Sequence, residues 1–341
     1  MESELFIRQD AADVTMNNFK SSEALRRSKL TIITPVYNEA AGLSNYEIGI
    51  TDVLLSLTEY DFEILLIDDG STDGSWEIIK AMCQKKDSFR GLRLSRNFGA
   101  HTAISAGFSH ASGDAVVILA CDLQDPPAVV PHFIYQWKAG AKIVWGKRKS
   151  RQDGVHRAWA SGIFTKLLQR YAMPRGSKFA TGSFLLADRK VVDCFNQFRE
   201  HNRITFALIA WTGFDQAVVE YDRVARKIGD SKWRFSSLLK AMYDAFIGFS
   251  LLPIRLITLL GLSVFLVSLA LLAYIAGSWL WGNPLAGWTS LMMLSTFFFG
   301  IQFLMIGVIG EYLYRIQSEV TGRPLYFISG TTSEKDPNAR S

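Results

Sequence analysis

A buried strand that ends in acidic residues constrains the fold of this chain more than any other stretch. Residues 115–121 are apolar and partly β-branched, which is typical of a strand inside a sheet. The run ends at Asp122, Gln124 and Asp125. Ligands bind at the carboxyl ends of strands in open parallel α/β sheets, and carboxylate and amide oxygens suit Mg²⁺ or Mn²⁺ better than zinc. The stretch therefore predicts a metal-binding edge, although Asp125 could instead cap a helix that begins at Pro126.

Short β-rich runs alternate with segments whose apolar residues have helical spacing. Strands are predicted at 30–35, 62–67, 91–94, 115–121 and 142–145, and helices at 41–57, 76–83, 101–110 and 126–138. This alternation is typical of βαβ units and predicts a parallel sheet. No G-x-G-x-x-G follows a strand, which argues against a dinucleotide-binding domain.

Polar residues follow three of the predicted strands. Residues 35–39 follow the first strand, Asp68 and Asp69 the second, and 122–125 the fourth. Because the carboxyl ends of parallel strands lie at one edge of a sheet, the three clusters are predicted to share one rim. Independent acidic turns are the alternative, but three of them at one edge favour a site.

A cation-rich segment begins where the last predicted strand ends. It carries Arg148, Lys149, Arg151, His156, Arg157, Lys166, Arg170, Arg175 and Lys178. The net charge of the whole chain is +5, which suits phosphate-bearing ligands, anionic lipid or nucleic acid. A solvated charged face is one interpretation of the segment. Its place beside the rim favours phosphate binding, for which the arginine fork is well suited.

The two ends of the chain are predicted to lie outside the α/β domain. Residues 1–28 are polar and lack a long apolar core, so we expect a mobile arm and no signal peptide. Residues after about Ser329 are polar and are expected to be disordered. The three cysteines are widely spaced, which indicates a reducing compartment, and Cys121 is expected to fill a core position.

Apolar segments near the C-terminus predict a membrane hairpin. Residues 235–255 have the spacing of an amphipathic interfacial helix. Residues 256–280 and 289–312 are each long enough to span a bilayer, giving transmembrane helices within 256–312. Tryptophans bracket the short link between them, as is common at membrane interfaces. A buried hairpin of a soluble protein is the alternative.

Positive charges flank the outer ends of the hairpin. Arg255 precedes the first span, and Arg315 and Arg323 follow the second. Both ends are therefore expected in the cytoplasm, with the α/β domain on the cytoplasmic side of a multi-pass protein of the inner (plasma) membrane and residues 313–341 as a cytoplasmic tail.

The strand-end motifs resemble those of a known enzyme family. Thr-Pro-Val-Tyr-Asn-Glu at 34–39 and Ile-Asp-Asp-Gly-Ser-Thr-Asp-Gly at 67–74 are similar to the nucleotide-binding half of GT-A, family 2 inverting glycosyltransferases. The motifs at 93–99, 122–127 and 310–326 narrow the resemblance to bacterial polyprenyl-phosphate glycosyltransferases. These include the bactoprenol glucosyltransferases and are related to dolichol-phosphate mannose synthase. The resemblance implies a GT-A (Rossmann-like nucleotide-diphospho-sugar transferase) domain, placed at residues 29–234.

The resemblance also implies a role for each part of the rim. The nucleotide sugar would be held by Pro35, Tyr37, Glu39, Asp68, Asp69 and Asn97. A metal ion, Mg²⁺ or Mn²⁺, would be held by Asp122 and Gln124, and the lipid phosphate by Arg148, Arg151 and Arg157. The catalytic set would be Asp122, Asp125, Arg148 and Arg157. A mobile loop with Arg226, Ser231 and Lys232 would close over the donor.

Two positions depart from the family pattern. Ala120 stands where relatives have an aspartate, so the metal site lacks one carboxylate and depends more on Asp122, with Gln124 as its helper. The stretch 180–185 lacks an acid and a base found in relatives, which weakens assignment of the donor sugar by analogy.

The implied reaction moves a hexose, glucose by resemblance, from a UDP-sugar to polyprenyl (undecaprenyl) phosphate for cell-envelope glycan modification. A phosphate monoester has a second pKa near ~6, so the acceptor is already largely dianionic and needs no strong general base. Asp125 is then a candidate base or phosphate-orienting group. The expected partners are the UDP-sugar, the lipid phosphate and the bilayer, with no nucleic acid, and a homo-oligomer suits a lone hairpin. Alternatives are a mannose, N-acetylated or amino sugar, a processive polysaccharide synthase, or a non-catalytic nucleotide-sugar-binding scaffold.

Overall fold

The computed structural model describes residues 27–149, 183–201, 203–223, short stretches between 257 and 274, and 287–332. Several predicted features lie outside these residues: the arm up to residue 26, Arg151, Arg157, the loop with Arg226, Ser231 and Lys232, and the 235–255 helix. The other predicted site residues are all described.

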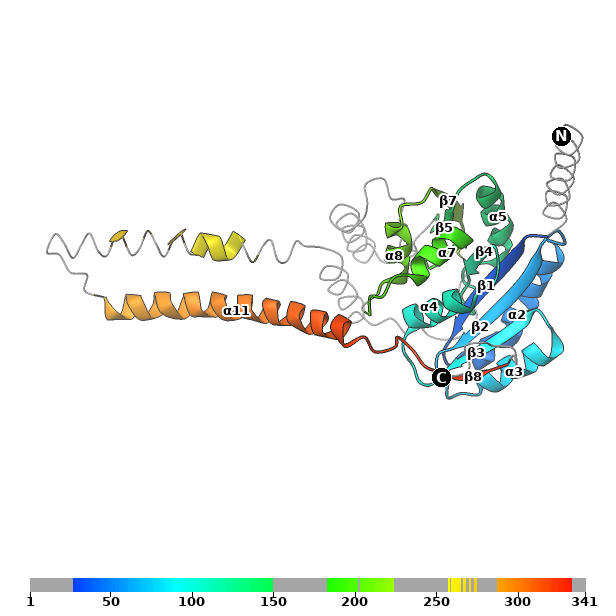
Figure 1. The fold of residues 1–341 in the computed structure, drawn as a ribbon, viewed down its shortest axis with the longest axis horizontal. Coiled ribbons are helices and arrows are strands. Elements are labelled where there is room, and N and C mark those ends of the chain that lie inside the picture. Colours follow the sequence, from blue (N-terminus) through cyan, green and yellow to red (C-terminus); the bar gives the residue numbers. More distant parts are fainter. Residues whose placement is uncertain are drawn as a thin grey trace, which may run out of the picture.

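An eight-stranded sheet in the order β7-β5-β6-β4-β1-β2-β3-β8 forms the centre of the α/β domain (Figure 1). Its strands are β1 (Lys29–Val36), β2 (Asp61–Asp68), β3 (Phe89–Leu94), β4 (Ala115–Ile118), β5 (Ile143–Arg148), β6 (Leu185–Asp188), β7 (Gln216–Tyr221) and β8 (Ile328–Thr331). β1 to β5 confirm the five predicted strands, and β4, β1, β2 and β3 are parallel neighbours.

The sheet is mixed, so the prediction of a parallel sheet is wrong for two strands, β6 inside the sheet and β8 at its edge. β6 runs antiparallel to both β4 and β5, and β8 runs antiparallel to β3. The direction of a strand depends on the end of the sheet from which the chain enters, and the apolar residues of the strand do not specify it. β5 keeps the direction of β4, because β6 is antiparallel to both. The end of β5 therefore lies at the same edge of the sheet as the end of β4.

Helices cover both faces of the sheet. On one face lie α4 (Ala100–His110), α7 (Arg189–Asn196) and α8 (Thr205–Trp211), and on the other α2 (Ala40–Leu55), α3 (Ser75–Lys85) and α5 (Val130–Lys138). Alternate residues of each strand enter the two cores: Ile33 packs on the α4 side and Ile32 on the α2 side. Cys121 is buried in the α2-side core, as predicted.

The long helix α11 (Trp288–Thr321) contains the expected span 289–312. Among the described residues, α11 is the one helix whose length and composition would allow it to cross a membrane. The segment that meets this criterion is Phe297–Thr321. The described positions between 257 and 274, in the other expected span, are helical. A Cβ at Gly261 would come 2.8 Å from Met305 Cε, so the two segments approach closely.

After α11 the chain returns to the α/β domain (Figure 1). The Glu319 carboxylate accepts the backbone N–H of His201, at 2.8 and 3.0 Å. β8 then pairs with β3, with Gly330 opposite Arg93. The expectation of disorder after about Ser329 is therefore wrong for the described residues up to 332. Main-chain hydrogen bonds hold β8, and such pairing does not require apolar side chains.

Candidate functional site

The ends of three neighbouring parallel strands form the predicted rim. β4, β1 and β2 lie side by side, with Val36 of β1 paired to Asp68 of β2. The predicted clusters, which are residues 35–39, Asp68 with Asp69, and residues 122–125, lie at or just after the ends of these strands. The three polar clusters therefore share one edge of the sheet, as predicted, and we call them the carboxyl-end rim.

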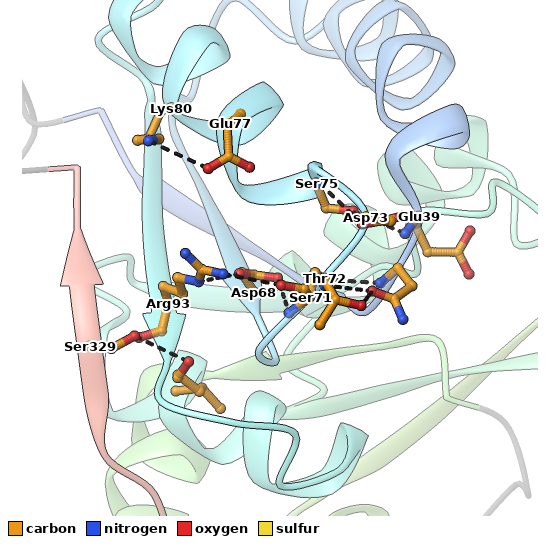
Figure 2. A network of polar contacts seen from close by, with 12 residues as sticks. Glu39, Asp68, Ser71, Thr72, Asp73, Ser75, Glu77, Lys80, Arg93 and Ser329 are labelled. Carbon is orange, nitrogen blue, oxygen red and sulfur yellow. Dashed lines mark hydrogen bonds and ion pairs between the residues drawn. The ribbon is translucent and has the colours of Figure 1, made fainter.

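The turns after β1 and β2 are fastened to each other (Figure 2). The Asn38 N–H donates to Ser71 Oγ at 3.0 Å, and Asn38 Oδ1 accepts the Thr72 N–H at 2.9 Å. The Ala40 N–H donates to Asp73 Oδ2 at 3.1 Å. Asn38 adopts a φ of 53°, a left-handed conformation that asparagine tolerates better than most residues. The two turns thus form one polar unit at the rim.

The Asp69 carboxylate fastens a third loop to this unit. It accepts the N–H groups of Phe98 at 2.8 Å and Gly99 at 2.9 Å. Burial raises the pKa of Asp69 above its usual value, and these hydrogen bonds act against that rise. Gly70, with a φ of 69°, lies so close to this loop that a Cβ would come within 2.5 Å of the Arg96 backbone. Only glycine fits at that position without displacing the loop.

Five of the six residues predicted to hold a nucleotide sugar lie in the clusters at the ends of β1 and β2, and Asn97 lies on the loop that Asp69 holds. Tyr37 and Asn97 are exposed, Pro35 and Glu39 are half-buried, and Asp68 and Asp69 are buried. The exposed side chains can contact a ligand directly. The buried carboxylates of Asp68 and Asp69 hold protein groups and shape the turn, so their assignment as ligand contacts stays a prediction.

Asp122 and Gln124 lie on the turn after β4, as the metal prediction requires. Both side chains are half-buried, and Asp122 Oδ1 accepts the Gln124 N–H at 3.2 Å. The described residues contain no group of three or more His, Cys, Asp or Glu placed to hold a metal ion, and Ala120 adds no ligand. Mg²⁺ is commonly bound by one or two carboxylates together with substrate phosphates and water. Asp122 and Gln124 therefore fit a divalent ion whose remaining ligands would come from a diphosphate and water.

Asp125 does not cap a helix, so that alternative is wrong. The following 3-10 turn, η1 (Pro127–Val129), has no side-chain cap, and the Asp125 carboxylate is buried beside β5 and β7. Tyr221 Oη donates to Asp125 Oδ1 at 2.5 Å. The same oxygen lies 3.6 Å from Arg148 Nη2 and 3.7 Å from Arg223 Nε. Asp125 does not accept a hydrogen bond from the start of the helix because its carboxylate is hydrogen-bonded to Tyr221, which is distant in the sequence.

Burial and the neighbouring Asp125 carboxylate raise the pKa of Tyr221 to about 12. The tyrosine is therefore a neutral hydrogen-bond donor throughout the physiological range. One negative charge on Asp125 faces two guanidinium groups, Arg148 and Arg223, and the surplus positive charge lies at the rim. Such a cluster can attract an anion such as phosphate.

Tyr221 and Arg223 were not predicted from the sequence. Gln216–Tyr221 is a strand followed by charged residues, the same pattern that identified the other rim clusters. The cations of residues 148–178 obscured that pattern, because the whole segment looks irregular. Arg148, in contrast, was predicted at this edge and lies there as the last residue of β5.

A mixed α/β sheet with helices on both faces and polar strand ends at one edge has the GT-A architecture. Residues 31–195 match the family model for glycosyl transferase family 2. The SfII prophage-derived bactoprenol glucosyl transferase of Shigella flexneri is 36% identical over 307 residues, which cover 88% of this chain and 97% of that protein. An uncharacterized glycosyltransferase, sll0501 of Synechocystis, is 36% identical over 306 residues, 88% of this chain and 95% of its own.

Similarity to solved structures is more distant. The mannosyltransferase PcManGT from Pyrobaculum calidifontis, solved with GDP-Man and Mn²⁺, is 18% identical with a TM-score of 0.43, covering 60% of this chain and 59% of its own. That similarity adds nothing to the assignment. The curated relatives suffice: the chain belongs to glycosyl transferase family 2 and is a glycosyltransferase.

Proposed function

We propose that this glycosyltransferase moves glucose from UDP-glucose to a polyprenyl phosphate, undecaprenyl phosphate, with inversion at the anomeric carbon. The relatives named bactoprenol glucosyl transferase match over 88% of the chain, a length that exceeds the α/β domain and supports a shared acceptor. The observation that carries the proposal is the junction at Asp125. There the acidic turn with Asp122 meets the arginine pair Arg148 and Arg223 at one rim.

The donor would occupy the part of the rim formed by the turns after β1 and β2. Tyr37 and Asn97 are exposed there, and Asp68 and Asp69 fix the turn beneath them. A bound Mg²⁺ or Mn²⁺ would neutralise charge that develops on the leaving diphosphate. Asp122 and Gln124 would hold that ion from the protein side.

The acceptor phosphate would bind at the arginine pair. Arg148 ends β5, and Arg223 lies two residues after β7, so neighbouring parallel strands present the two guanidinium groups side by side. Asp125 holds both and leaves them with a net positive charge for a phosphate dianion. The predicted lipid-phosphate residues Arg151 and Arg157 follow Arg148 in the sequence and would extend this site.

The chemistry then needs positioning more than proton transfer. A phosphate oxygen of the acceptor attacks the anomeric carbon and forms the new C–O bond. The bond from that carbon to the UDP oxygen breaks, and UDP leaves with the electron pair. A phosphate monoester is largely dianionic at neutral pH, with a second pKa near ~6, so no side chain has to remove a proton. Asp125 therefore orients the arginines and is not a base.

The membrane would hold the acceptor at the level of its headgroups. α11 supplies one span, and residues 256–280 supply the other, a hairpin that the approach of Gly261 to Met305 supports. The arginines outside both spans favour a cytoplasmic α/β domain at the inner membrane. The 235–255 helix would lie in the interface, and the loop with Arg226, Ser231 and Lys232 would cover the donor. A homo-oligomer would add contacts for the hairpin.

The test is a transfer assay with the full chain in detergent. Radiolabelled UDP-glucose, Mg²⁺ and undecaprenyl phosphate are expected to give labelled lipid, whereas labelled UDP-N-acetylglucosamine and GDP-mannose are expected to give little. Asp122→Ala should abolish the transfer, and Asp52→Ala, which alters an exposed carboxylate of α2, should not. Label that stays water-soluble or enters a polysaccharide would overturn the lipid acceptor. Faster transfer from another sugar nucleotide would overturn the assignment of glucose as the transferred sugar.

A further inference from the structure

The strand that follows α11 completes the sheet beside the proposed donor turn. β8 pairs with β3, and hydrogen bonds extend the pairing at both ends: the Ser95 N–H donates to the Phe327 carbonyl at 2.9 Å, and the Thr332 N–H to the Gly91 carbonyl at 3.0 Å. Thr332 Oγ1 accepts the Gly91 N–H at 2.8 Å. The edge of the catalytic sheet is thus made by residues that lie after the candidate membrane helix.

Arg93 connects this edge to the carboxyl-end rim. It is the β3 residue opposite Gly330 of β8, and its main-chain oxygen accepts the Ser329 hydroxyl at 3.3 Å. Its side chain crosses to the turn after β2, where Nε lies 3.2 Å from Asp68 Oδ2 and Nη2 donates to the Ser71 carbonyl at 3.1 Å. Figure 2 shows Ser329, Arg93 and Asp68 in sequence from β8 to this turn.

The turn that Arg93 reaches is the one that organises the donor side of the rim. The buried Asp68 carboxylate accepts the Ser71 N–H at 3.1 Å, and Ser71 Oγ accepts the Asn38 N–H at 3.0 Å. Asp69, the next residue, holds the loop that carries Asn97. A shift of Arg93 would therefore move both segments that present the exposed residues Tyr37 and Asn97.

Trp76 and β8 contact the Arg93 side chain on the side that faces away from Asp68. The Arg93 guanidinium lies over the Trp76 ring, 5.9 Å from its centroid. A Cβ at Gly330 would lie in ordinary van der Waals contact, 3.4 Å from Trp76 and 3.8 Å from Arg93 Cβ, so a branched side chain at this position would press on both residues. Arg93 is held between β8, Trp76 and the buried Asp68.

We infer that β8 and Arg93 position the donor turn, so that the segment after the membrane helix sets the affinity of the site for the nucleoside diphosphate. Arg93 is a positioning residue in this arrangement, since it acts through Asp68 and Ser71. The inference rests on the proposed donor site. It adds that the catalytic domain without its C-terminal strand would lack an ordered donor turn.

Arg90 offers a matched control on the same strand. Like Arg93 it pairs with a buried carboxylate of β2, with Nη1 2.5 Å from Glu63 Oε1, but at the opposite end of the sheet. Both Arg90→Lys and Arg93→Lys keep the charge and lose the guanidinium fork, so both are expected to lower the melting temperature. Only the change at Arg93 should alter donor binding.

The experiment measures KM for each substrate and calorimetric binding of UDP with Mg²⁺, using the full chain in detergent. Arg93→Lys is expected to raise the KM for UDP-glucose and the Kd for UDP by up to about 30-fold, the effect of one lost hydrogen bond to a charged group. The KM for undecaprenyl phosphate should not change. Gly330→Val, which crowds Trp76 and Arg93 from β8, should shift the donor constants in the same direction.

Three results would overturn the inference: equal UDP affinity in Arg93→Lys and Arg90→Lys, equal rises in both KM values, or a Gly330→Val chain that folds and binds UDP as tightly as wild type. Absence of sugar transfer by the wild-type chain would count against the proposed function instead. The calorimetric comparison of the two arginine variants would still decide the role of Arg93, because it needs no acceptor.

Discussion

Replacing Tyr221 by phenylalanine tests the assignment of Asp125 as an orienting group. The change removes one hydroxyl and leaves the ring, which packs at right angles to Phe184, in place. The lost hydrogen bond joins Tyr221 Oη to Asp125 Oδ1 at 2.5 Å. Asp125 keeps its charge and its two arginine neighbours but loses the group that fixes its rotation.

The size of the effect follows from the burial of the pair. Asp125 is 2% exposed, so water replaces little of the lost hydrogen bond. A hydrogen bond to a charged group contributes about 2 kcal/mol, which corresponds to a change of about 30-fold in an equilibrium constant. If the bond orients Arg148 and Arg223 for the acceptor, the kcat/KM for undecaprenyl phosphate falls by up to about this factor, and the KM for UDP-glucose stays the same.

The assay measures initial rates of labelled-lipid formation while the concentration of lipid phosphate and the pH are varied. The pKa of Tyr221 is raised to about 12, so the tyrosine does not titrate in this range. The acidic limb of the rate profile is expected near the second pKa of the phosphate monoester, ~6, in both wild type and Tyr221→Phe. Tyr135→Phe, at an exposed tyrosine of α5, is the matched control.

Two results would refute this reasoning. One is a kcat/KM for undecaprenyl phosphate in Tyr221→Phe that equals that of Tyr135→Phe. The other is an acidic limb that disappears in Asp125→Asn, because a limb set by Asp125 would make that carboxylate the general base.

Two further predictions concern charge at the two ends of the sheet. Arg148→Ala is expected to raise the KM for undecaprenyl phosphate at least tenfold, by loss of a charge-assisted contact, with little change in the KM for UDP-glucose; equal changes would argue against a phosphate-binding role. Burial would raise the pKa of Glu63, but Thr31, Ser112 and Arg90 donate hydrogen bonds that lower it from 4.5 to about 2. The stabilisation is therefore present above pH 4.5 and is lost as the pH falls towards 2, so Glu63→Gln should lower the free energy of unfolding by about 3 kcal/mol at neutral pH and converge with wild type in acid. Denaturation of both proteins across that range checks this, and a constant difference at every pH would contradict it.

The sequence predicted the strands of the rim because their signals are local. β1, β2 and β4 are apolar runs that stop at polar residues, and their parallel order brings those residues together. Nothing local indicates that β6 enters between β4 and β5 in the opposite direction. That arrangement depends on how the chain crosses the sheet, which strand composition does not encode.

The same limit explains why the sequence left two alternatives open for Asp125 and did not predict β8. A cap is a local interaction and can be predicted from neighbours, whereas the Tyr221 partner of Asp125 comes from another strand. Ile328–Thr331 contains one large apolar residue and pairs by its main chain, so hydropathy could not identify it as a strand. The chemistry of the strand ends predicted the metal-binding edge and the phosphate-binding arginines, whereas the roles of individual residues toward a nucleotide sugar came from motif resemblance.

In the proposed membrane arrangement, the length of α11 would make it a spacer as well as an anchor. Its 34 residues correspond to roughly 51 Å of helix, whereas the hydrocarbon core of a bilayer is ~30 Å thick. The uncharged part ends at Gly310, and the turns from there to Glu319 form a stalk of roughly 14 Å that ends at the contact of Glu319 with His201. Because both Glu319 and β8 attach to the α/β domain, this stalk would set the height of the carboxyl-end rim above the membrane surface in that arrangement. Under the proposed function, one extra helical turn inserted there would lift the rim by ~5.4 Å, away from the acceptor phosphate in the headgroup layer.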